Sequence, residues 1–404
     1  MRPLRRNRDF LLLEAGRLLS SGGTSLTAIA YPLLVLALTH SPAKAGLVTF
    51  ARLTPYALFA LVAGVATDRW NRKRLMVVSD AVRAAAMGAL GAVILTGNAE
   101  LWAILVIAFV EGTGSTFFSA AEAGALRAVV PPAQLPAAVG VREARGSVVR
   151  LGGPPLGGAL FALSRAVPFV ADAASYAFST LSLLAMRTPF QEPRDRSTAS
   201  LRAQVTEGFR FLWTHPFLRT AAFLYGVGNF LVPAMLFVLI VVGRRQGLSG
   251  AEIGALTAGL GAGTLVGSLA SPWFRKTFSV RIILLLELWT WLGGWAFVIW
   301  PNAYALAAAL TLFGLAAPVT DSVVIGYRLA MTPDRLVGRV ESVRSNISLL
   351  VAPLGPLAAG LLLESTSERV TVALLAAVGL GLALWGTLSP SIRGAPSLAG
   401  LSAK

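Results

Sequence analysis

The chain of 404 residues contains no cysteine and only two histidines, and both scarcities restrict its chemistry. Without cysteine there is no disulfide, no thiolate metal site and no cysteine nucleophile. His40 and His215 fall in polar stretches predicted on opposite sides of a membrane, so they cannot form a metal-binding or catalytic pair. The chain also lacks a GxxxxGK phosphate-binding sequence, so direct use of ATP is unsupported. The residues therefore predict neither an enzyme nor a bound metal or cofactor.

Charge is scarce as well, and its scarcity points to a bilayer. Charged residues make up 13 % of the chain and hydrophobic residues 55 %, with a mean hydropathy of +0.69. This balance excludes an ordinary soluble domain. The apolar run after Arg8 continues to about Thr39, too long for the core of a cleavable signal, which predicts that the first span is retained.

Spans of about 20 or more mostly apolar residues can cross a membrane as helices. Twelve such spans are predicted, at residues 10–39, 44–66, 75–96, 101–127, 137–163, 167–186, 219–243, 250–272, 281–300, 303–328, 336–363 and 369–388. The sequence therefore predicts an all-α membrane protein with both termini on the same side.

The formal net charge of +16 would favour a nucleic-acid partner in a soluble protein, but the basic residues fall on one set of loops. That side holds Arg2, Arg5, Arg6, Arg8, Arg69, Arg72, Lys73, Arg74, Arg187, Arg194, Arg196, Arg202, Arg275, Lys276, Arg281, Arg335, Arg339, Arg393 and Lys404. By the positive-inside rule, both termini are expected in the cytoplasm of a chain embedded in the inner, cytoplasmic membrane. The positive charge thus reports topology, and no nucleic acid is expected as a partner.

One stretch occurs twice, half a chain apart. Gly64-Val-Ala-Thr-Asp68-Arg69-Trp-Asn-Arg72-Lys73 is echoed by Gly267-Ser-Leu-Ala-Ser-Pro-Trp-Phe-Arg275-Lys276, and 267 − 64 gives 203 in 404 residues. Such a repeat indicates two parallel six-helix halves that move about a central site. The predicted organisation is a bundle at 1–186, a cytoplasmic linker at 187–218, a second bundle at 219–390 and a cytoplasmic tail at 391–404.

The linker is expected to contain an amphipathic helix. Leu201, Val205, Phe209 and Leu212 are spaced by four, four and three residues, which places them on one helical face. Two partners for this face remain open, because periodicity does not distinguish the membrane surface from the base of a bundle.

Four stretches resemble the major facilitator superfamily, within it the drug and siderophore exporter branch that includes macrolide efflux pumps and the enterobactin exporter. They are the Gly64–Lys73 loop, the Gly153-Pro-Pro-Leu-Gly-Gly158 run, the Glu207–Pro216 linker, and Pro333–Val340 followed by Pro353-Leu-Gly-Pro356. The resemblance implies two pseudo-symmetric six-helix bundles and a transporter. The substrate must be argued from the site, because this superfamily carries many kinds of molecule.

The resemblance also implies a gating role for the repeated loop. Gly64, Asp68, Arg69, Arg72 and Lys73 match the signature between the second and third helices of the superfamily. An ion pair of the acid with the basic pair would hold one of two bundle packings. The second copy keeps Arg275 and Lys276 but has serine in place of the acid, so the expected latch is asymmetric. The alternative is that these basic residues serve topology alone.

The run on the fifth span resembles the motif typical of exporters. Proline bends a helix and glycine lets helices approach closely, so Gly153, Pro154, Gly157 and Gly158 are expected to form a seal or hinge. A second glycine row, Gly259, Gly263 and Gly267, forms a smooth face suited to close contact between bundles, with ordinary helix packing as the alternative.

Ionisable residues inside apolar spans are functional candidates, because a charge in the membrane is expensive. Glu111, near the middle of its span, is the first candidate for proton coupling, and Glu122 is the second. The alternative is a fixed ion pair with Arg17, Arg52 or Arg142.

Aromatic, amide and charged groups inside spans suit a bulky amphipathic ligand. The candidates for a substrate cavity are Arg17, Tyr31, Arg52, Tyr225 and Asn229. Aromatic side chains that face lipid or mark the interface are the alternative.

The sequence thus predicts a secondary transporter that exports a small organic molecule, either a drug-like compound or a secreted metabolite or siderophore, in exchange for protons. Its other partner is the lipid bilayer. Uptake or facilitated diffusion of a nutrient is one alternative. A membrane sensor or scaffold that transports nothing is another.

Overall fold

The computed structural model describes residues 4–190 and 201–395, and of residues 68, 123, 201–205, 334 and 335 it describes the backbone alone. The described residues form helices joined by short loops, without any β-strand. This confirms the all-α membrane architecture that the apolar spans predict. The Asp68 side chain and the predicted tail beyond residue 395 lie outside the described residues.

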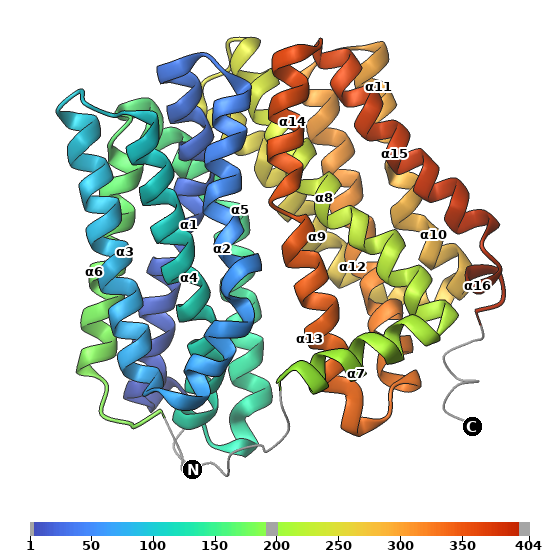
Figure 1. The fold of residues 1–404 in the computed structure, drawn as a ribbon, viewed down its shortest axis with the longest axis horizontal. Helices are drawn as coiled ribbons and strands as arrows, with labels where there is room; N and C mark the ends of the chain where they lie inside the picture. Colours follow the sequence, from blue (N-terminus) through green and yellow to red (C-terminus); the bar gives the residue numbers. More distant parts are fainter. Residues whose placement is uncertain (1–3, 191–200, 396–404) are drawn as a thin grey trace. The chain divides into compact units, whose positions relative to one another are not determined.

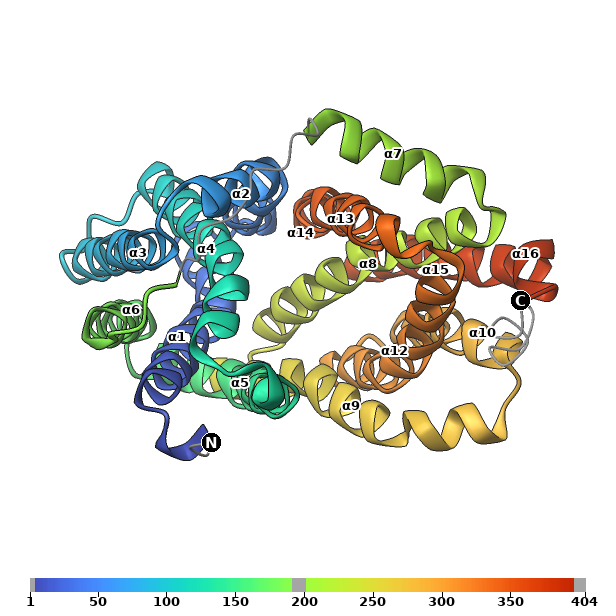
Figure 2. The same cartoon turned by 90° about the horizontal axis from the view of Figure 1, so that it is seen from below.

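The chain divides into two compact units, residues 1–195 with 247–258 and residues 196–246 with 259–404. The helices of the first unit, seen along their length in Figure 1 and end-on in Figure 2, form a bundle in which α1 contacts α2, α5 and α6. They are α1 (Arg8–Thr39), α2 (Pro42–Arg69), α3 (Arg72–Leu95), α4 (Leu101–Val129), α5 (Leu135–Leu163) and α6 (Val167–Ala185), with short 3₁₀ turns at Leu4–Arg6 and Pro132–Gln134.

The remaining helices belong to the second unit, except that the first turns of α9 group with the first. They are α7 (Leu201–Thr214), α8 (Pro216–Arg245), α9 (Gly250–Thr277), α10 (Val280–Thr290), α11 (Gly293–Ile299), α12 (Ala303–Met331), α13 (Asp334–Val351), α14 (Leu354–Ser365), α15 (Glu368–Leu388) and α16 (Pro390–Arg393). Two predicted spans are broken, one into α10 and α11 and the other into α13 and α14. Pro353 lies at the second break, since proline has no N–H to donate and its ring opposes the preceding turn.

Eleven stretches of the described residues are long and apolar enough to cross a membrane. They correspond to eleven of the twelve predicted spans, with α10–α11 and α13–α14 each counted once. The twelfth, α5, is 29 residues long. It is less apolar because Arg142, Glu143, Arg145 and Arg150 crowd its first half and glycine and proline fill much of its second.

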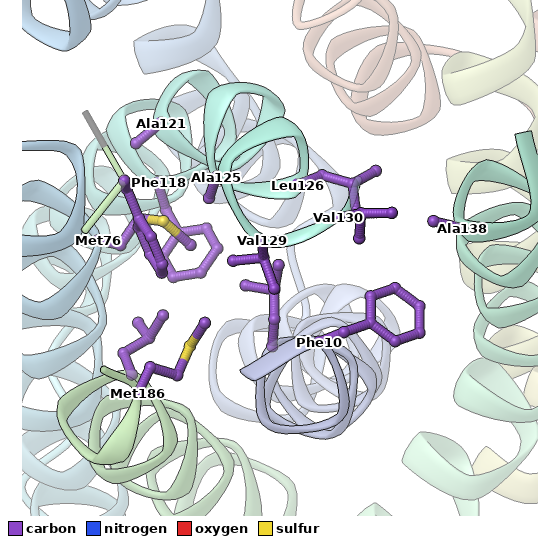
Figure 3. Packing of buried hydrophobic residues seen from close by; sticks show 13 residues of the cluster. Phe10, Met76, Phe118, Ala121, Ala125, Leu126, Val129, Val130, Ala138 and Met186 are labelled. Carbon is purple, nitrogen blue, oxygen red and sulfur yellow. The ribbon is translucent and has the colours of Figure 1, made fainter. Parts of the chain in front are cut away.

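An apolar cluster closes one end of the first unit. Its buried members include Phe10 of α1, Met76 of α3, Phe118 and Leu126 of α4, and Met186 after α6 (Figure 3). Phe10, Met76, Leu126 and Met186 lie near helix ends next to the basic loops, and Phe118 lies further along α4. The cluster thus packs the helix ends expected on the cytoplasmic side.

Glycines allow the closest helix contacts in both units. A Cβ on Gly157 of α5 would lie 2.4 Å from the Leu26 backbone oxygen of α1, and one on Gly153 would lie 2.1 Å from Ser25 Oγ. In α9, a Cβ on Gly263 would lie 2.2 Å from the Thr311 oxygen of α12. At this position the α9 glycine row therefore packs against α12 of its own unit.

The linker helix α7 is present and crosses α13 (Figure 1). Leu212 is buried against Leu336 and Val340, whereas Phe209 is 44 % exposed and stacks on Trp213. The expected apolar face therefore splits. Leu212 packs on the bundle, and the Phe209–Trp213 pair is left on the surface.

Candidate functional site

A buried network of charged side chains lies inside the first unit. It comprises Arg52 of α2, Asp80 and Arg83 of α3, Glu111 of α4 and Asp172 of α6. All five are buried, and the Arg83 and Glu111 side chains are each 1 % exposed. We call these five residues the buried charge network. In an apolar bundle such charges persist only when they are paired, so their contacts define what the network can do.

Glu111 is the centre of this network. Its Oε2 accepts a hydrogen bond from Arg52 Nε at 2.8 Å, and its Oε1 accepts one from Arg83 Nη2 at 3.1 Å. Arg83 also donates from Nη1 to Asp80 Oδ1 at 2.9 Å. One glutamate therefore joins guanidinium groups from two different helices, which combines opposite charge with directed hydrogen bonds.

Hydroxyl groups extend the network to α1 and α6. The Tyr176 hydroxyl accepts from Arg83 Nη2 at 2.6 Å and donates to Glu111 Oε1 at 3.0 Å. Thr24 of α1 accepts from the same Arg83 nitrogen at 2.9 Å. The Arg52 guanidinium lies 5.3 Å from the centre of the Tyr31 ring. Five helices of the bundle, α1, α2, α3, α4 and α6, thus contribute to the contacts of the two arginines.

Asp172 is held differently from the other two carboxylates. Its Oδ2 accepts from Thr27 Oγ1 at 3.0 Å and its Oδ1 from Ser175 Oγ at 3.2 Å. No arginine or lysine among the described residues forms an ion pair with it. Gly23 makes room for this carboxylate, because a Cβ there would lie 2.2 Å from Asp172 Oδ1.

The charges of the network do not balance. Two arginines, Arg52 and Arg83, face three carboxyl groups, Asp80, Glu111 and Asp172, so full ionisation leaves a net charge of 2 − 3 = −1. One proton on a carboxyl group removes this excess. Asp172 is the group whose protonation breaks no ion pair.

A second ionic cluster lies nearer the basic loops. Glu122 Oε1 accepts from Arg17 Nε at 2.8 Å and from Arg145 Nη2 at 3.1 Å, and Arg145 Nη1 bonds Glu14 Oε2 at 2.7 Å. Glu122 is thus a partner of two arginines, as Glu111 is. The fixed pairing that the sequence left open as an alternative is present for both glutamates, with Arg52 and Arg17 among the partners.

A cavity of about 450 Å³ lies inside the second unit. We call it the α8–α13 cavity. Its walls are mostly apolar and are formed by Leu212, Leu218, Ala221, Ala222, Tyr225, Gly226, Gly228, Asn229, Val232, Pro233, Glu287, Phe313, Ala317, Asp321, Val324, Ile325, Arg328, Val340, Arg344, Ile347, Ser348 and Ala352. A concave, largely apolar site with a few polar groups is the usual form of a small-molecule site.

Two predicted substrate residues line this cavity. The Tyr225 hydroxyl donates to the Leu284 backbone oxygen at 2.7 Å, and Asn229 Nδ2 donates to Ser348 Oγ at 3.2 Å. The other three predicted substrate residues lie in the first unit; they are Arg17, Tyr31 and Arg52. The structure therefore brings only Tyr225 and Asn229 together in a described cavity.

Glu287 of α10 is a buried carboxylate in the wall of the cavity. It is 7 % exposed, and its Oε2 has no hydrogen-bond partner among the described residues. The two cavity arginines are paired elsewhere, since Arg328 Nη2 lies 2.7 Å from one oxygen of Glu341 and Arg344 Nη2 lies 2.5 Å from the other. A buried carboxylate without a donor is costly unless a proton or a ligand compensates it.

The basic residues of the repeated loop are placed as follows. Arg72 Nε donates to the Thr67 backbone oxygen at 3.2 Å, and Lys73 Nζ donates to the Met186 backbone oxygen at 2.5 Å. Arg69 is exposed at the end of α2. Arg275 and Lys276 are exposed at the end of α9. The proposed pairing with Asp68 involves a side chain outside the described residues.

Of the exporter-like run, Gly153, Gly157 and Gly158 are buried and Pro154 is half-buried within α5. The first two glycines contact α1, so the run fixes a helix contact inside the first unit.

Sequence reasoning missed Asp80 and Arg83, the α3 members of the network. Both lie inside the predicted 75–96 span at a spacing of three, which places them on one helical face. A charged pair inside an apolar span was the available signal. Metal binding finds no support in the described ranges, where no three His, Asp or Glu side chains gather as ligands.

Comparison with known proteins agrees with this architecture. The multidrug efflux pump Tap of Mycolicibacterium fortuitum is 27 % identical over 395 residues, covering 95 % of this chain and 96 % of that protein. The enterobactin exporter EntS of Escherichia coli O127:H6 is 28 % identical over 397 residues, covering 94 % and 90 %.

Among solved structures, a bacterial homologue of the iron transporter ferroportin in an inward-facing state has a TM-score of 0.71 at 16 % identity, and each chain is covered completely. The nucleoside transporter NupG has a TM-score of 0.71 at 12 % identity, covering 96 % of this chain and 100 % of that one. Residues 14–276 match the sequence profile of the Major Facilitator Superfamily. The chain belongs to the Major Facilitator Superfamily and has the fold of its transporters.

Proposed function

We propose that this transporter exports a small organic molecule from the cell in exchange for protons. The observation that carries the proposal is the α8–α13 cavity, which combines a volume of about 450 Å³ with apolar walls and a few polar side chains. Such a site suits an amphipathic organic ligand better than a sugar, which would need polar partners around its whole surface.

The relatives support the direction of transport. Tap and EntS, which align over nearly the whole chain, are an efflux pump and an exporter by name. The Gly153–Gly158 run resembles the exporter motif and fixes close contact between α5 and α1. Pro154, next to this contact, is proposed to bend α5 and so to form a seal against backflow.

Proton coupling is assigned to the buried charge network. Glu111 holds Arg52 and Arg83 together, and Asp172 is the carboxyl group that exchanges the proton. When Asp172 is ionised, the excess negative charge favours new partners for the two arginines, which biases one packing of the helices over another. Glu122 is proposed to act in the same way on the Arg17 and Arg145 side.

The loop Gly64–Lys73 and its partial copy at Arg275 and Lys276 are proposed to gate the cytoplasmic side. Lys73 reaches the Met186 oxygen at the end of α6, so it already joins two elements of one unit. In the proposed orientation both termini lie in the cytoplasm and the chain occupies the cell membrane, as the basic loops predict.

Directional flux in inverted membrane vesicles tests the proposal. In vesicles that contain the chain, an imposed proton gradient is expected to drive an organic dye such as ethidium inward, which corresponds to export from the cell. Flux in the opposite direction would indicate uptake instead. Vesicles that behave like those without the chain would support a sensor or scaffold and contradict the proposal.

A further inference from the structure

The charge of the transported molecule can be inferred from the α8–α13 cavity. This inference rests on the proposed function, because it treats the cavity as the place where the substrate binds. Two carboxylates that line the cavity form no ion pair among the described residues: Asp321, which is exposed, and Glu287, which is buried.

The other charged groups around the cavity sum to zero formal charge, although Asp321 forms no ion pair among the described residues. Arg328 and Arg344 both form ion pairs with Glu341, at 2.7 and 2.5 Å, and Asp321 lines the same cavity. These four groups contribute 2 − 2 = 0 charges. Glu287 then adds one negative charge that no described arginine or lysine neutralises.

Glu287 is placed to meet a ligand. It lies on α10, three residues before the end of that helix at Thr290, and lines the cavity. Only 7 % of the residue is exposed. Gly228 of α8 is a neighbour of this carboxylate, because a Cβ there would lie 3.9 Å from Glu287 Oε1, which is an ordinary van der Waals contact. Both residues line the cavity, and glycine at position 228 adds no side chain beside the carboxylate.

The surroundings of Glu287 specify the rest of the ligand. Apolar surface comes from Val232 of α8, Phe313 of α12 and Ile347 of α13. Asn229 of α8 adds a side-chain amide. A cation with a large apolar body meets both requirements, because it supplies the missing positive charge and replaces water along the apolar walls. An anion would bring a like charge next to a buried carboxylate.

We infer that the α8–α13 cavity binds an organic cation, whose charge pairs with Glu287 and whose apolar body contacts α8, α12 and α13. Glu287 is accordingly a specificity-determining residue, and it selects cationic over anionic molecules of the same shape.

Binding to the purified full chain tests the inference with two probes of matched shape. Tetraphenylphosphonium is a cation, and tetraphenylborate is an anion of nearly the same size. The wild-type chain is expected to bind the cation more tightly than the anion. Because this comparison needs no substitution, it remains informative if a variant fails to fold. The inference would be overturned if the cation did not bind, or if it bound no more tightly than the anion.

Substitution then tests the residue. Glu287→Gln keeps the size of the side chain and is expected to weaken tetraphenylphosphonium binding about 10- to 100-fold, as loss of one partner of a buried charge pair does. Binding of tetraphenylborate should not weaken. Glu287→Asp keeps the charge and should retain the preference for the cation. Glu368→Gln, which removes a carboxylate paired with Arg245 outside the cavity, is the matched control.

The outcomes separate this inference from the proposed function. If Glu287→Gln leaves cation binding unchanged while vesicles still show proton-driven export, Glu287 does not select the substrate and only the inference fails. If cation binding depends on Glu287 but no vesicle flux occurs, export is wrong and the binding site stands.

Discussion

Arg83 donates a hydrogen bond to Glu111 at 3.1 Å, and the side chains of both residues are 1 % exposed. Since Arg52 reaches the other oxygen of the same carboxylate, Glu111 compensates two guanidinium groups inside one helical bundle. A residue in this position determines both the stability of the bundle and the arrangement of its charges.

Replacing Glu111 with glutamine is expected to destabilise the protein strongly. The change removes the carboxylate that pairs with Arg52 and one of the two that pair with Arg83, and removal of one partner from a buried pair costs about 3–5 kcal/mol. The measurement is the melting temperature of the purified protein in detergent. Glu368→Gln is the control, because its exposed pair with Arg245 should contribute about 1 kcal/mol or less. Equal melting temperatures for the two variants would contradict the central role of Glu111.

Replacing Asp172 with asparagine is expected to affect coupling more than stability. The asparagine side-chain oxygen can still accept from Thr27 or Ser175, and no arginine loses an ion pair. The variant should melt close to the wild-type temperature, while its dye flux should no longer respond to an imposed pH gradient. A variant with normal gradient-driven flux would exclude Asp172 as the proton-exchanging carboxyl group and return attention to Glu111 and Glu122.

Replacing Gly157 with alanine is expected to separate α5 from α1. The added Cβ would lie 2.4 Å from the Leu26 backbone oxygen, and backbone cannot move aside as a flexible side chain can. A loss of about 1–3 kcal/mol in stability is expected from such overpacking, together with reduced export. Gly152→Ala is the control in the same helix, because no atom lies within 4 Å of its Cβ position. If both variants lose stability equally, helix contact is not the reason for the glycine.

Filling the α8–α13 cavity is expected to block binding without unfolding the chain. Gly226 lines the cavity, and a Cβ there meets nothing within 4 Å, so the ring of Gly226→Phe can enter open space. Tetraphenylphosphonium binding and dye export should both decrease. Gly381→Phe, at another glycine with open space but outside the cavity, should leave both unchanged. Unchanged binding in Gly226→Phe would place the ligand elsewhere.

The absence of native cysteine makes the topology directly testable. Trp70 and Asn98 are exposed residues in the loops after α2 and α3, which the positive-inside rule places on opposite sides. A single Asn98→Cys variant should react with a membrane-impermeant maleimide in intact cells, whereas Trp70→Cys should react only after the cells are opened. The reverse pattern would invert the proposed orientation.

The fold could be predicted because its determinants are local. A helix that crosses a bilayer needs a long apolar run, and eleven of the predicted spans satisfy this criterion as helices. The breaks between α10 and α11 and between α13 and α14 were not predicted, since proline and glycine occur in several spans that remain continuous.

The site could be predicted only in part. The depth of Glu111 and Arg52 along their spans was evident from the sequence, and both proved to be partners. Which helix faces which is not encoded in the composition of one span, so the contribution of Arg83 and the isolation of Glu287 emerged only from the packing. For the same reason Tyr225 and Asn229 line one cavity while Arg17, Tyr31 and Arg52 lie in the other unit.

The central claim is that an organic molecule and protons move in opposite directions through this chain. The most direct measurement is the internal pH of proteoliposomes, followed with a trapped pH-sensitive dye while an organic cation is added to one side. The account predicts that the cation triggers proton movement out of the compartment it enters, and that Asp172→Asn abolishes this response. Cation flux without any proton movement, in vesicles where the wild-type chain is folded and active, would contradict it.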